Sequence, residues 1–253
     1  NSASEAFDHL AVGEELTLVY TIEVEDLANA TDSQQVTITI TGTNDMPMIT
    51  VGGSDSAAET LGVTGSALTT GGSLSVADLD RTDVVTAAVS SFAKTGNLAG
   101  LTLNDAQLEA MLSLGASVIS NTQQSGTIHW DFDSAGYSFG YLAAGQSITL
   151  TYTITVTDSQ GTTDTQDVVI TINGANTAPE ITVEPGDNAS EGLIETNSTL
   201  SSSGTLSVLD INTTDVVTSQ VSSVVASGVT TGLGSNNAAL LSMLAVNANV
   251  INN

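Results

Sequence analysis

Apolar and polar residues alternate along two neighbouring segments of the chain, and this alternation predicts its main strands. In residues 147–156, SITLTYTITV, every second residue from Ile148 to Val156 is apolar, and serine or threonine stands between them. A period of two places alternate side chains on opposite faces, so one face of this strand is expected to be buried. The turn-forming sequence DSQGTTD follows, and the alternation resumes in residues 168–172. The pattern therefore predicts a hairpin.

This hairpin is the second copy of a sequence that occurs earlier in the chain. Residues 13–51 and 145–183 align without a gap at an offset of 132 positions (145 − 13), with 21 identical residues among 39. The same offset matches LSVADLDRTDVV at 74–85 to LSVLDINTTDVV at 206–217. A fixed period without insertions is typical of tandem structural repeats. The predicted parts are the C-terminal part of one repeat at 1–46, a complete repeat at 47–178, and the N-terminal part of the next at 179–253.

The complete repeat contains further strand patterns and one helix pattern. Strands are predicted at residues 74–76, 84–89, 127–132, 147–156 and 167–172. A capping residue followed by an apolar face predicts one short helix in each copy, from Asn104 or Asp105 with Leu108, Met111 and Leu112, and from Asn236 or Asn237 with Leu240, Met243 and Leu244. Short strands separated by frequent turns predict an all-β fold of tandem Ig-like or cadherin-like β-sandwich repeats.

The charge of the chain bears on its partners. Its 253 residues include 28 Asp and Glu against 2 Lys and Arg, which gives a net charge of −26. Such a surface repels nucleic acid and anionic membranes, and no apolar run approaches the roughly 18–20 residues of a membrane span. It also repels itself, which favours neutralisation by a divalent cation. Calcium is the first candidate because it prefers carboxylate and carbonyl oxygens.

The absence of cysteine and the start of the chain add two expectations. Without cysteine no disulfide forms, so stability has to come from core burial and from metal. Residue 1 is not a methionine and no signal peptide follows it, so the chain is expected to be an internal piece of a longer polypeptide.

The hairpin copies and their closing segments, TYTITVTDSQGTTDTQDVVITINGANTAPEI and ITGTNDMPMI, resemble the VCBS repeat. The segments AFDHLAVGEELTLVYTIEVED and LSVADLDRTDVV resemble it as well, so the likeness covers essentially the whole chain. The resemblance implies a secreted or cell-surface extender in a large bacterial biofilm adhesin, of which many are exported by type I secretion. Its partners would be neighbouring repeats of the same or identical chains. Thr177 departs from the pattern because it replaces the aspartate of the usual GTNDxP.

The likeness to cadherin-type arrays implies calcium sites at the joints between repeats, residues 42–47 and 174–179. In such arrays, acidic residues from one domain, the linker and the next domain hold the ion together. The implied ligands are Asn44, Asp45, Glu59, Asp78, Asp80 and Asp83 at the first joint, and Asn176, Glu191, Asp210, Asn212 and Asp215 at the second. Asp and Asn also form turns without any metal, and this alternative stays open.

Four further carboxylates flank the turns of the two hairpins, Asp26, Asp32, Asp158 and Asp164. They are interpreted as solvated turn residues, because aspartate is common in turns.

Other functions have less support in the sequence. The chain has two histidines, His9 and His129, neither in a recognisable catalytic arrangement, so no enzymatic activity is expected. A carbohydrate- or surface-binding module is the alternative, since the rings of Trp130, Tyr137 and Tyr141 could stack on sugars. Trp130 shares a strand face with apolar neighbours, which favours a place in the core.

The ends of the chain allow an alternative mode of assembly. The N-terminal part of a repeat at one end and the C-terminal part at the other could complete each other between chains, giving a head-to-tail fibre by strand addition. The counterpart of residues 122–132 is absent from both parts.

Overall fold

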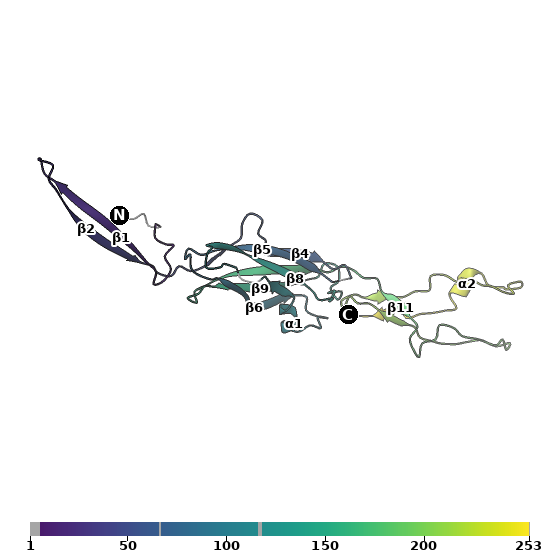
Figure 1. Cartoon of the computed structure of the whole chain (residues 1–253). Helices are drawn as coiled ribbons and strands as arrows, with labels where there is room; N and C mark the ends of the chain where they lie inside the picture. Colours follow the sequence, from purple (N-terminus) through teal and green to yellow (C-terminus); the bar gives the residue numbers. More distant parts are fainter. Residues whose placement is uncertain (1–5, 66, 116–117, 253) are drawn as a thin grey trace.

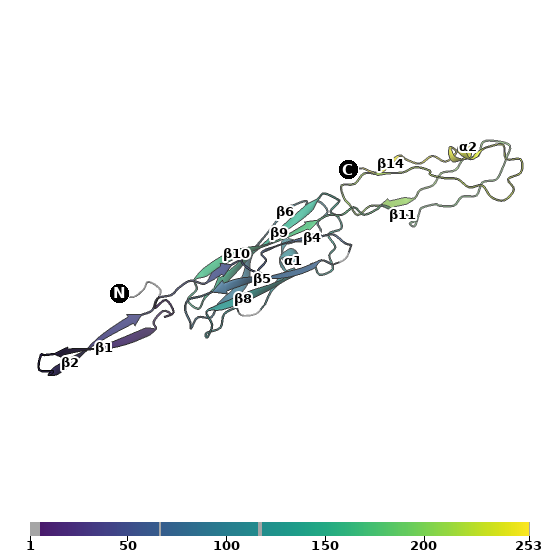
Figure 2. The same ribbon diagram turned by 90° about the horizontal axis from the view of Figure 1, so that it is seen from above.

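The computed structural model describes residues 6–65, 67–115 and 118–252. Within them the chain forms an elongated series of three parts: a hairpin, a closed sandwich and an open segment (Figures 1 and 2). Residues 1–5 and 253, which belong to the first and third predicted repeats, lie outside the described residues.

The central sandwich consists of two four-stranded sheets. The first has the order β4-β10-β9-β6, with β4 at Ala58–Gly62, β6 at Thr86–Gly96, β9 at Ser147–Thr157 and β10 at Thr163–Asn173. The second has the order β3-β5-β8-β7, with β3 at Met48–Thr50, β5 at Thr69–Ala77, β7 at Leu112–Leu114 and β8 at Ser125–Asp133. Neighbouring strands are antiparallel, except that β4 runs parallel to β10.

The core lies between these sheets and follows the alternation of the sequence. Along β9 every second side chain from Ile148 to Val156 is fully buried. β8 contributes Trp130, which is 1 % exposed and donates its indole N–H to the carbonyl oxygen of Ser56 at 2.9 Å. The predicted place of Trp130 in the core is confirmed. Tyr141 is buried as well, so two of the three rings considered for sugar stacking are withdrawn from solvent.

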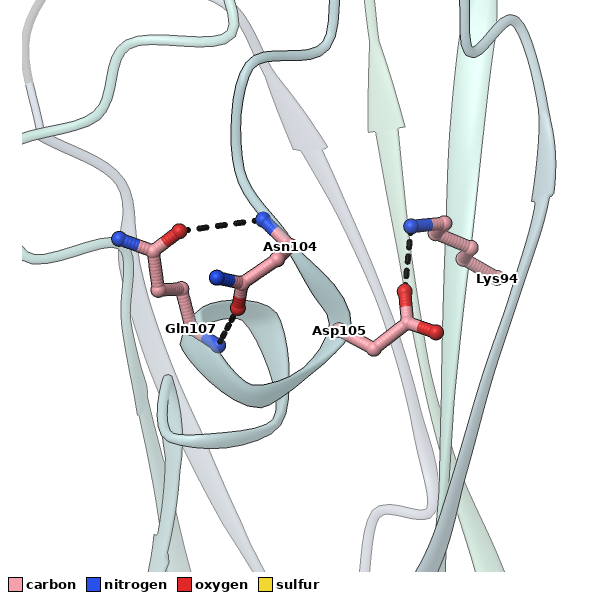
Figure 3. Close-up of polar contacts among 4 residues, drawn as sticks. All are labelled: Lys94, Asn104, Asp105 and Gln107. Carbon is pink, nitrogen blue, oxygen red and sulfur yellow. Dashed lines mark hydrogen bonds and ion pairs between the residues drawn. The ribbon is translucent and has the colours of Figure 1, made fainter.

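One short helix, α1 (Asp105–Glu109), lies against β6 of the sandwich. Figure 3 shows its capping box: Gln107 N donates to Asn104 Oδ1 at 2.9 Å, and Asn104 N donates to Gln107 Oε1 at 3.1 Å. Asp105 also pairs with Lys94. Asn104 is therefore the cap. α2 (Asn237–Leu241) is capped by Asn236, which accepts from Ala239 N at 2.9 Å, without the reciprocal bond of a capping box. Each helix ends before the methionine that was predicted to lie on its apolar face. In the first copy the chain continues from Glu109 toward β7, and in the second it continues from Leu241 as a loop.

The predicted strands of the complete repeat are confirmed with one shift. Residues 74–76, 127–132, 147–156 and 167–172 lie inside β5, β8, β9 and β10. The segment predicted at 84–89 begins as strand only at Thr86 and continues to Gly96, because Val85 makes an isolated bridge to Ile119. The prediction of an all-β fold with Ig-like or cadherin-like sandwiches and one short helix per copy is confirmed.

The first part of the chain is a lone hairpin of β1 (Glu15–Glu25) and β2 (Thr31–Thr41). It has the same register as the β9–β10 hairpin, since Tyr20 faces Val36 where Tyr152 faces Val168. No second sheet covers it among the described residues. Tyr20 is therefore 49 % exposed, whereas Tyr152 is fully buried.

The third part is open. It holds two two-stranded sheets, formed by β11 (Glu180–Thr182) with β12 (Ser207–Leu209) and by β13 (Val217–Thr218) with β14 (Asn249–Ile251). Of its described residues only Asn212 and Val217 are buried. Its described residues form no counterpart of β8, β9 or β10. Across the described chain, neither helix has the length and apolarity to cross a membrane.

Candidate metal centre

Three carboxylates meet where the first joint enters the sandwich. Each of Asp78, Asp83 and Asp158 offers an oxygen, and these oxygens lie within 4.8 Å of one another. Asp78 directly follows β5, and Asp158 directly follows β9. The pairing of Thr86 with Thr157 brings the loop before β6 to the same end of the sheet as the β9–β10 turn. Strand pairing thus assembles a site from positions about 80 residues apart (158 − 78).

Several side-chain oxygens at this end of the sandwich are buried without a hydrogen-bond donor. Asp78, Asp80 and Asp83 are at most 3 % exposed. One carboxylate oxygen of each, together with Asn44 Oδ1, has no hydrogen-bond partner among the residues that the structure describes. A buried oxygen without a partner is strongly unfavourable, and more so when it carries charge. The group of Asp78, Asp83 and Asp158, with unpartnered oxygens on Asp78 and Asp83, therefore matches the ligand preference of a hard divalent cation such as calcium.

The same carboxylates use their other oxygens to hold the loops in place. Asp78 Oδ1 accepts a hydrogen bond from Asp80 N at 3.0 Å. Asp80 Oδ2 accepts from Asp45 N at 2.8 Å, so the joint is tied directly to the sandwich. The loop continues with a hydrogen bond from Asp83 N to Asp80 O at 3.3 Å. The fold therefore fixes the carboxylates of Asp78 and Asp80 by one oxygen each and leaves the second oxygen for a ligand.

Asp158 connects the cluster to the β9–β10 turn and to the joint. Its Oδ1 accepts from Gln160 N at 2.9 Å and from Thr162 N at 2.8 Å. Its Oδ2 accepts from Asn44 Nδ2 at 3.0 Å and from the Thr162 hydroxyl. Asp158 is 7 % exposed, so its interpretation as a solvated turn residue is wrong. Its position just after a strand is the signal that the sequence offered.

The other three turn carboxylates lie apart from the cluster. Asp26 and Asp32 are exposed in the lone hairpin, as interpreted. Asp164 is half-buried, and its Oδ2 accepts from Ile49 N at 2.8 Å. It attaches β3 to β10 and is not a solvated residue.

Burial and mutual repulsion shift the pKa values of the carboxyl groups at this end of the sandwich. Burial is the largest cause that raises the pKa of Asp80, to about 6, and repulsion from Asp45, Asp78 and Asp83 adds to it. Burial and nearby carboxylates raise the pKa of Asp78 and of Asp83 as well. For Asp158, burial raises the pKa, but the hydrogen bonds from Asn44 and Thr162 together outweigh it and lower the pKa.

These shifts predict an unusual pH dependence for the protein without divalent cations. Since the folded pKa of Asp80 lies above its ordinary value of 3.8, the folded state binds this proton more tightly than the unfolded state. The contribution of Asp80 to stability is therefore fully present below pH 3.8 and is lost as the pH rises to about 6. In chelator, we expect a higher melting temperature at pH 5 than at pH 7.5, measured by circular dichroism.

The matched variant is Asp80→Asn, which should flatten this dependence in chelator. With calcium present, the order should reverse, because protons compete with the cation for the carboxylates. A wild-type melting temperature in chelator that rises from pH 5 to pH 7.5 would contradict the raised pKa of Asp80.

Glu59 is not brought to the cluster. It lies in β4 opposite Ile170 and accepts a hydrogen bond from Ser56 Oγ at 2.7 Å. Asp164, near the cluster end of β10, is six residues before Ile170. At about 3.3 Å per residue this places Glu59 roughly 20 Å along the strand from that end.

The predicted residues of the second joint are only partly brought together. Asn212 N donates to Asp210 Oδ1 at 2.9 Å, and Asp215 N donates to Asn212 O at 3.1 Å, as in the first joint. Glu191 instead pairs with Asn188, at 2.7 Å. Asn176 is exposed and its amide reaches only the carbonyl of the next residue, at 3.5 Å. The described residues of the third part contain no counterpart of Asp158 at the repeat offset.

Comparisons with known proteins identify no family for this chain. No family model matches it, and no curated protein does. Among solved structures, PapD-like domain 7 of human CEP192 matches with a TM-score of 0.34 and 10 % identity, over 52 % of this chain and 86 % of that one. The CooA pilin subunit of enterotoxigenic Escherichia coli matches with a TM-score of 0.32 and 12 % identity, over 51 % and 97 %.

Zebrafish RET cadherin-like domains 1 to 4 match with a TM-score of 0.25 and 14 % identity, over 69 % of this chain and 38 % of that chain. TM-scores this low assign the chain to none of these families.

Proposed function

We propose that this chain is a structural extender of a secreted or cell-surface bacterial adhesin or extracellular filament, in which calcium fixes one repeat on the next. The observation that carries the proposal is the cluster of buried, unpartnered carboxylate oxygens at the first joint. Its ligands come from the sandwich and from the linker before it.

The first joint has the connections that such a role needs. Asn44 donates to Asp158, and the amide of Asp45 donates to Asp80, so two consecutive linker residues contact the next sandwich. On the other side, Arg81 N contacts the carbonyl oxygen of His9 at 3.5 Å. A cation at the cluster would neutralise Asp78, Asp80, Asp83 and Asp158, none of which makes an ion pair among the described residues. Both repeats would then be held at a fixed angle.

The alternative of a sugar-binding module loses its main support. It depends on stacking of exposed aromatic rings, but Trp130 and Tyr141 are buried, and the hydroxyl of Tyr141 donates to Asn97 O at 2.9 Å. Tyr137 remains partly exposed and packs edge-on against Phe139, with ring centroids 4.8 Å apart. No row of accessible rings results.

The alternative of assembly between chains would leave a sheet without a central strand. β1 and β2 could supply the counterparts of β9 and β10 to the open third part of another chain. Neither part holds a counterpart of β8, which lies between β5 and β7 and brings Ile128, Trp130 and Phe132 into the core. A segment similar in sequence to residues 47–133 would include a counterpart of β8. Such a segment would therefore pack on the hairpin more completely than the third part of a second copy of this chain.

Small-angle X-ray scattering tests the proposed role. In calcium we expect the profile of one elongated, rigid particle. In chelator the loss of the joint should give a broader distribution of interatomic distances and a raised high-angle region in the Kratky plot. Asp131→Asn is the matched control, because Asp131 is exposed on β8 and far from the joint. Identical profiles with and without chelator would refute rigidification by calcium.

A further inference from the structure

The two joints are built alike on their upstream side. A Cβ atom on Gly42 would lie 2.2 Å from the carbonyl oxygen of Leu10, and one on Gly174 would lie 2.5 Å from that of Leu142. Only glycine tolerates such an approach, so both linkers pass their upstream repeat in the same way. Each upstream repeat therefore presents equivalent carbonyl oxygens to the linker.

The downstream side is built alike as well. The linker amide of Asp45 donates to Asp80 Oδ2 at 2.8 Å, and the linker amide of Thr177 donates to Asn212 Oδ1 at 2.6 Å. Position 212 corresponds to position 80 at the repeat offset of 132. Asp80 and Asn212 thus occupy equivalent places, and one oxygen of each performs the same task.

The second atom of the side chain distinguishes the two joints. Asn212 Nδ2 donates to the carbonyl oxygens of Gly140 at 3.1 Å, Leu142 at 3.2 Å and Ala175 at 3.3 Å. Asn212 is 2 % exposed. Its amide group therefore ties the downstream loop to the upstream repeat and to the linker by hydrogen bonds alone.

At the first joint the same place is taken by an oxygen. Asp80 Oδ1 is fully buried and finds no hydrogen-bond partner in the described part of the chain. The carbonyl groups at the corresponding positions belong to Asp8, Leu10 and Thr43 (140, 142 and 175, each less 132). A carboxylate cannot donate to carbonyl oxygens, so this arrangement needs a positive centre between them.

We propose that the residue at this position sets the main difference in how the two joints are held. Asp80 makes the first joint dependent on a divalent cation, whereas the amide of Asn212 takes over the bridging role of the cation at the second joint. Thr177, which stands where the first joint has Asp45, removes one more carboxylate from the second joint. The inference rests on the proposed role of calcium at the first joint and adds that the second joint holds without it.

Hydrogen exchange of the two linker amides, detected by NMR on the full chain, tests each joint separately. In wild type, chelation should reduce the protection of the Asp45 amide at least about tenfold and leave that of Thr177 within about twofold. Asp80→Asn should keep Asp45 protected in chelator. Asn212→Asp should make the protection of Thr177 depend on calcium. Unchanged exchange of the β9 amides verifies that each variant is folded.

The outcomes separate this inference from the proposal beneath it. If calcium binds by calorimetry but chelation exposes both amides alike, the inference is overturned and the calcium joint stands. If Asn212→Asp leaves Thr177 unprotected even in calcium, no cation replaces the amide and the inference is equally overturned. If wild type binds no calcium and neither amide responds, both proposals fail. Asp131→Asn should behave as wild type throughout.

Discussion

Chelation of calcium is expected to lower the melting temperature of the central sandwich by about 10 °C or more. A ligand present at about a thousand times its dissociation constant stabilises the folded state by about 4 kcal/mol, which corresponds to a shift of this size in a domain of this length. Removing the cation also restores repulsion among Asp78, Asp80, Asp83 and Asp158. Differential scanning calorimetry in calcium and in chelator measures the difference.

Asp83→Asn makes the test sharper because its effect should change sign with the cation. No side-chain hydrogen bond is lost, since Asp83 Oδ2 has no partner in the described structure. In chelator the variant should melt higher than wild type, because one buried charge is gone. In calcium it should melt lower, because a ligand is gone. Equal shifts in both buffers, or no difference from Asp131→Asn, would rule out the cluster as a metal site.

Replacing Trp130 by alanine is expected to destabilise the central sandwich by about 3–5 kcal/mol. The ring of Trp130 fills the space between the two sheets. A Cβ atom on Gly72 would lie 2.6 Å from Cζ2 of this ring, so the ring is in close contact with the backbone of β5. The substitution also leaves the carbonyl of Ser56 without its donor. Urea denaturation followed by circular dichroism gives the change in the free energy of unfolding.

The neighbouring residue provides the control. His129 lies on the same strand and faces solvent, so His129→Ala should change the free energy of unfolding by no more than about 0.5 kcal/mol. Trp130→Phe should fall between the two. A loss below about 1 kcal/mol for Trp130→Ala would contradict the buried role of the ring and reopen the question of a binding surface.

Local pattern was enough to find five of the eight described strands of the complete repeat, but it missed the short strands β3, β4 and β7 and does not say which strands are covered. Ile148 and Val156 alternate as apolar residues do in a half-buried strand, and both are buried. Tyr20 has the same pattern around it as Tyr152, yet it stays half exposed. The difference comes from the facing sheet, whose strands are distant in sequence, and no periodicity within one strand can report it.

The candidate site was predictable in part: the linker residues Asn44 and Asp45 and the loop carboxylates were named, but Asp158 was not. Asp78, Asp80 and Asp83 belong to one loop, and the likeness to cadherin-type arrays implies them as ligands. Asp158 joins them through the pairing of β6 with β9, which the alternation does not specify. Glu59 recurs as Glu191 at the repeat offset of 132, but recurrence shows an equivalent position and not proximity to the joint.

The parallel pairing of β4 with β10 has a consequence for the chain under tension. The polypeptide enters the sandwich before β3 and leaves it at the end of β10, so a pull on both ends draws β4 and β10 in opposite directions along their common axis. Residues 58–62 and 169–173 are paired over this stretch. Their hydrogen bonds are loaded in shear and have to break together, whereas an antiparallel pair pulled from one end opens bond by bond. The order of strands that closes the core is therefore also one that resists force along the length of the repeat.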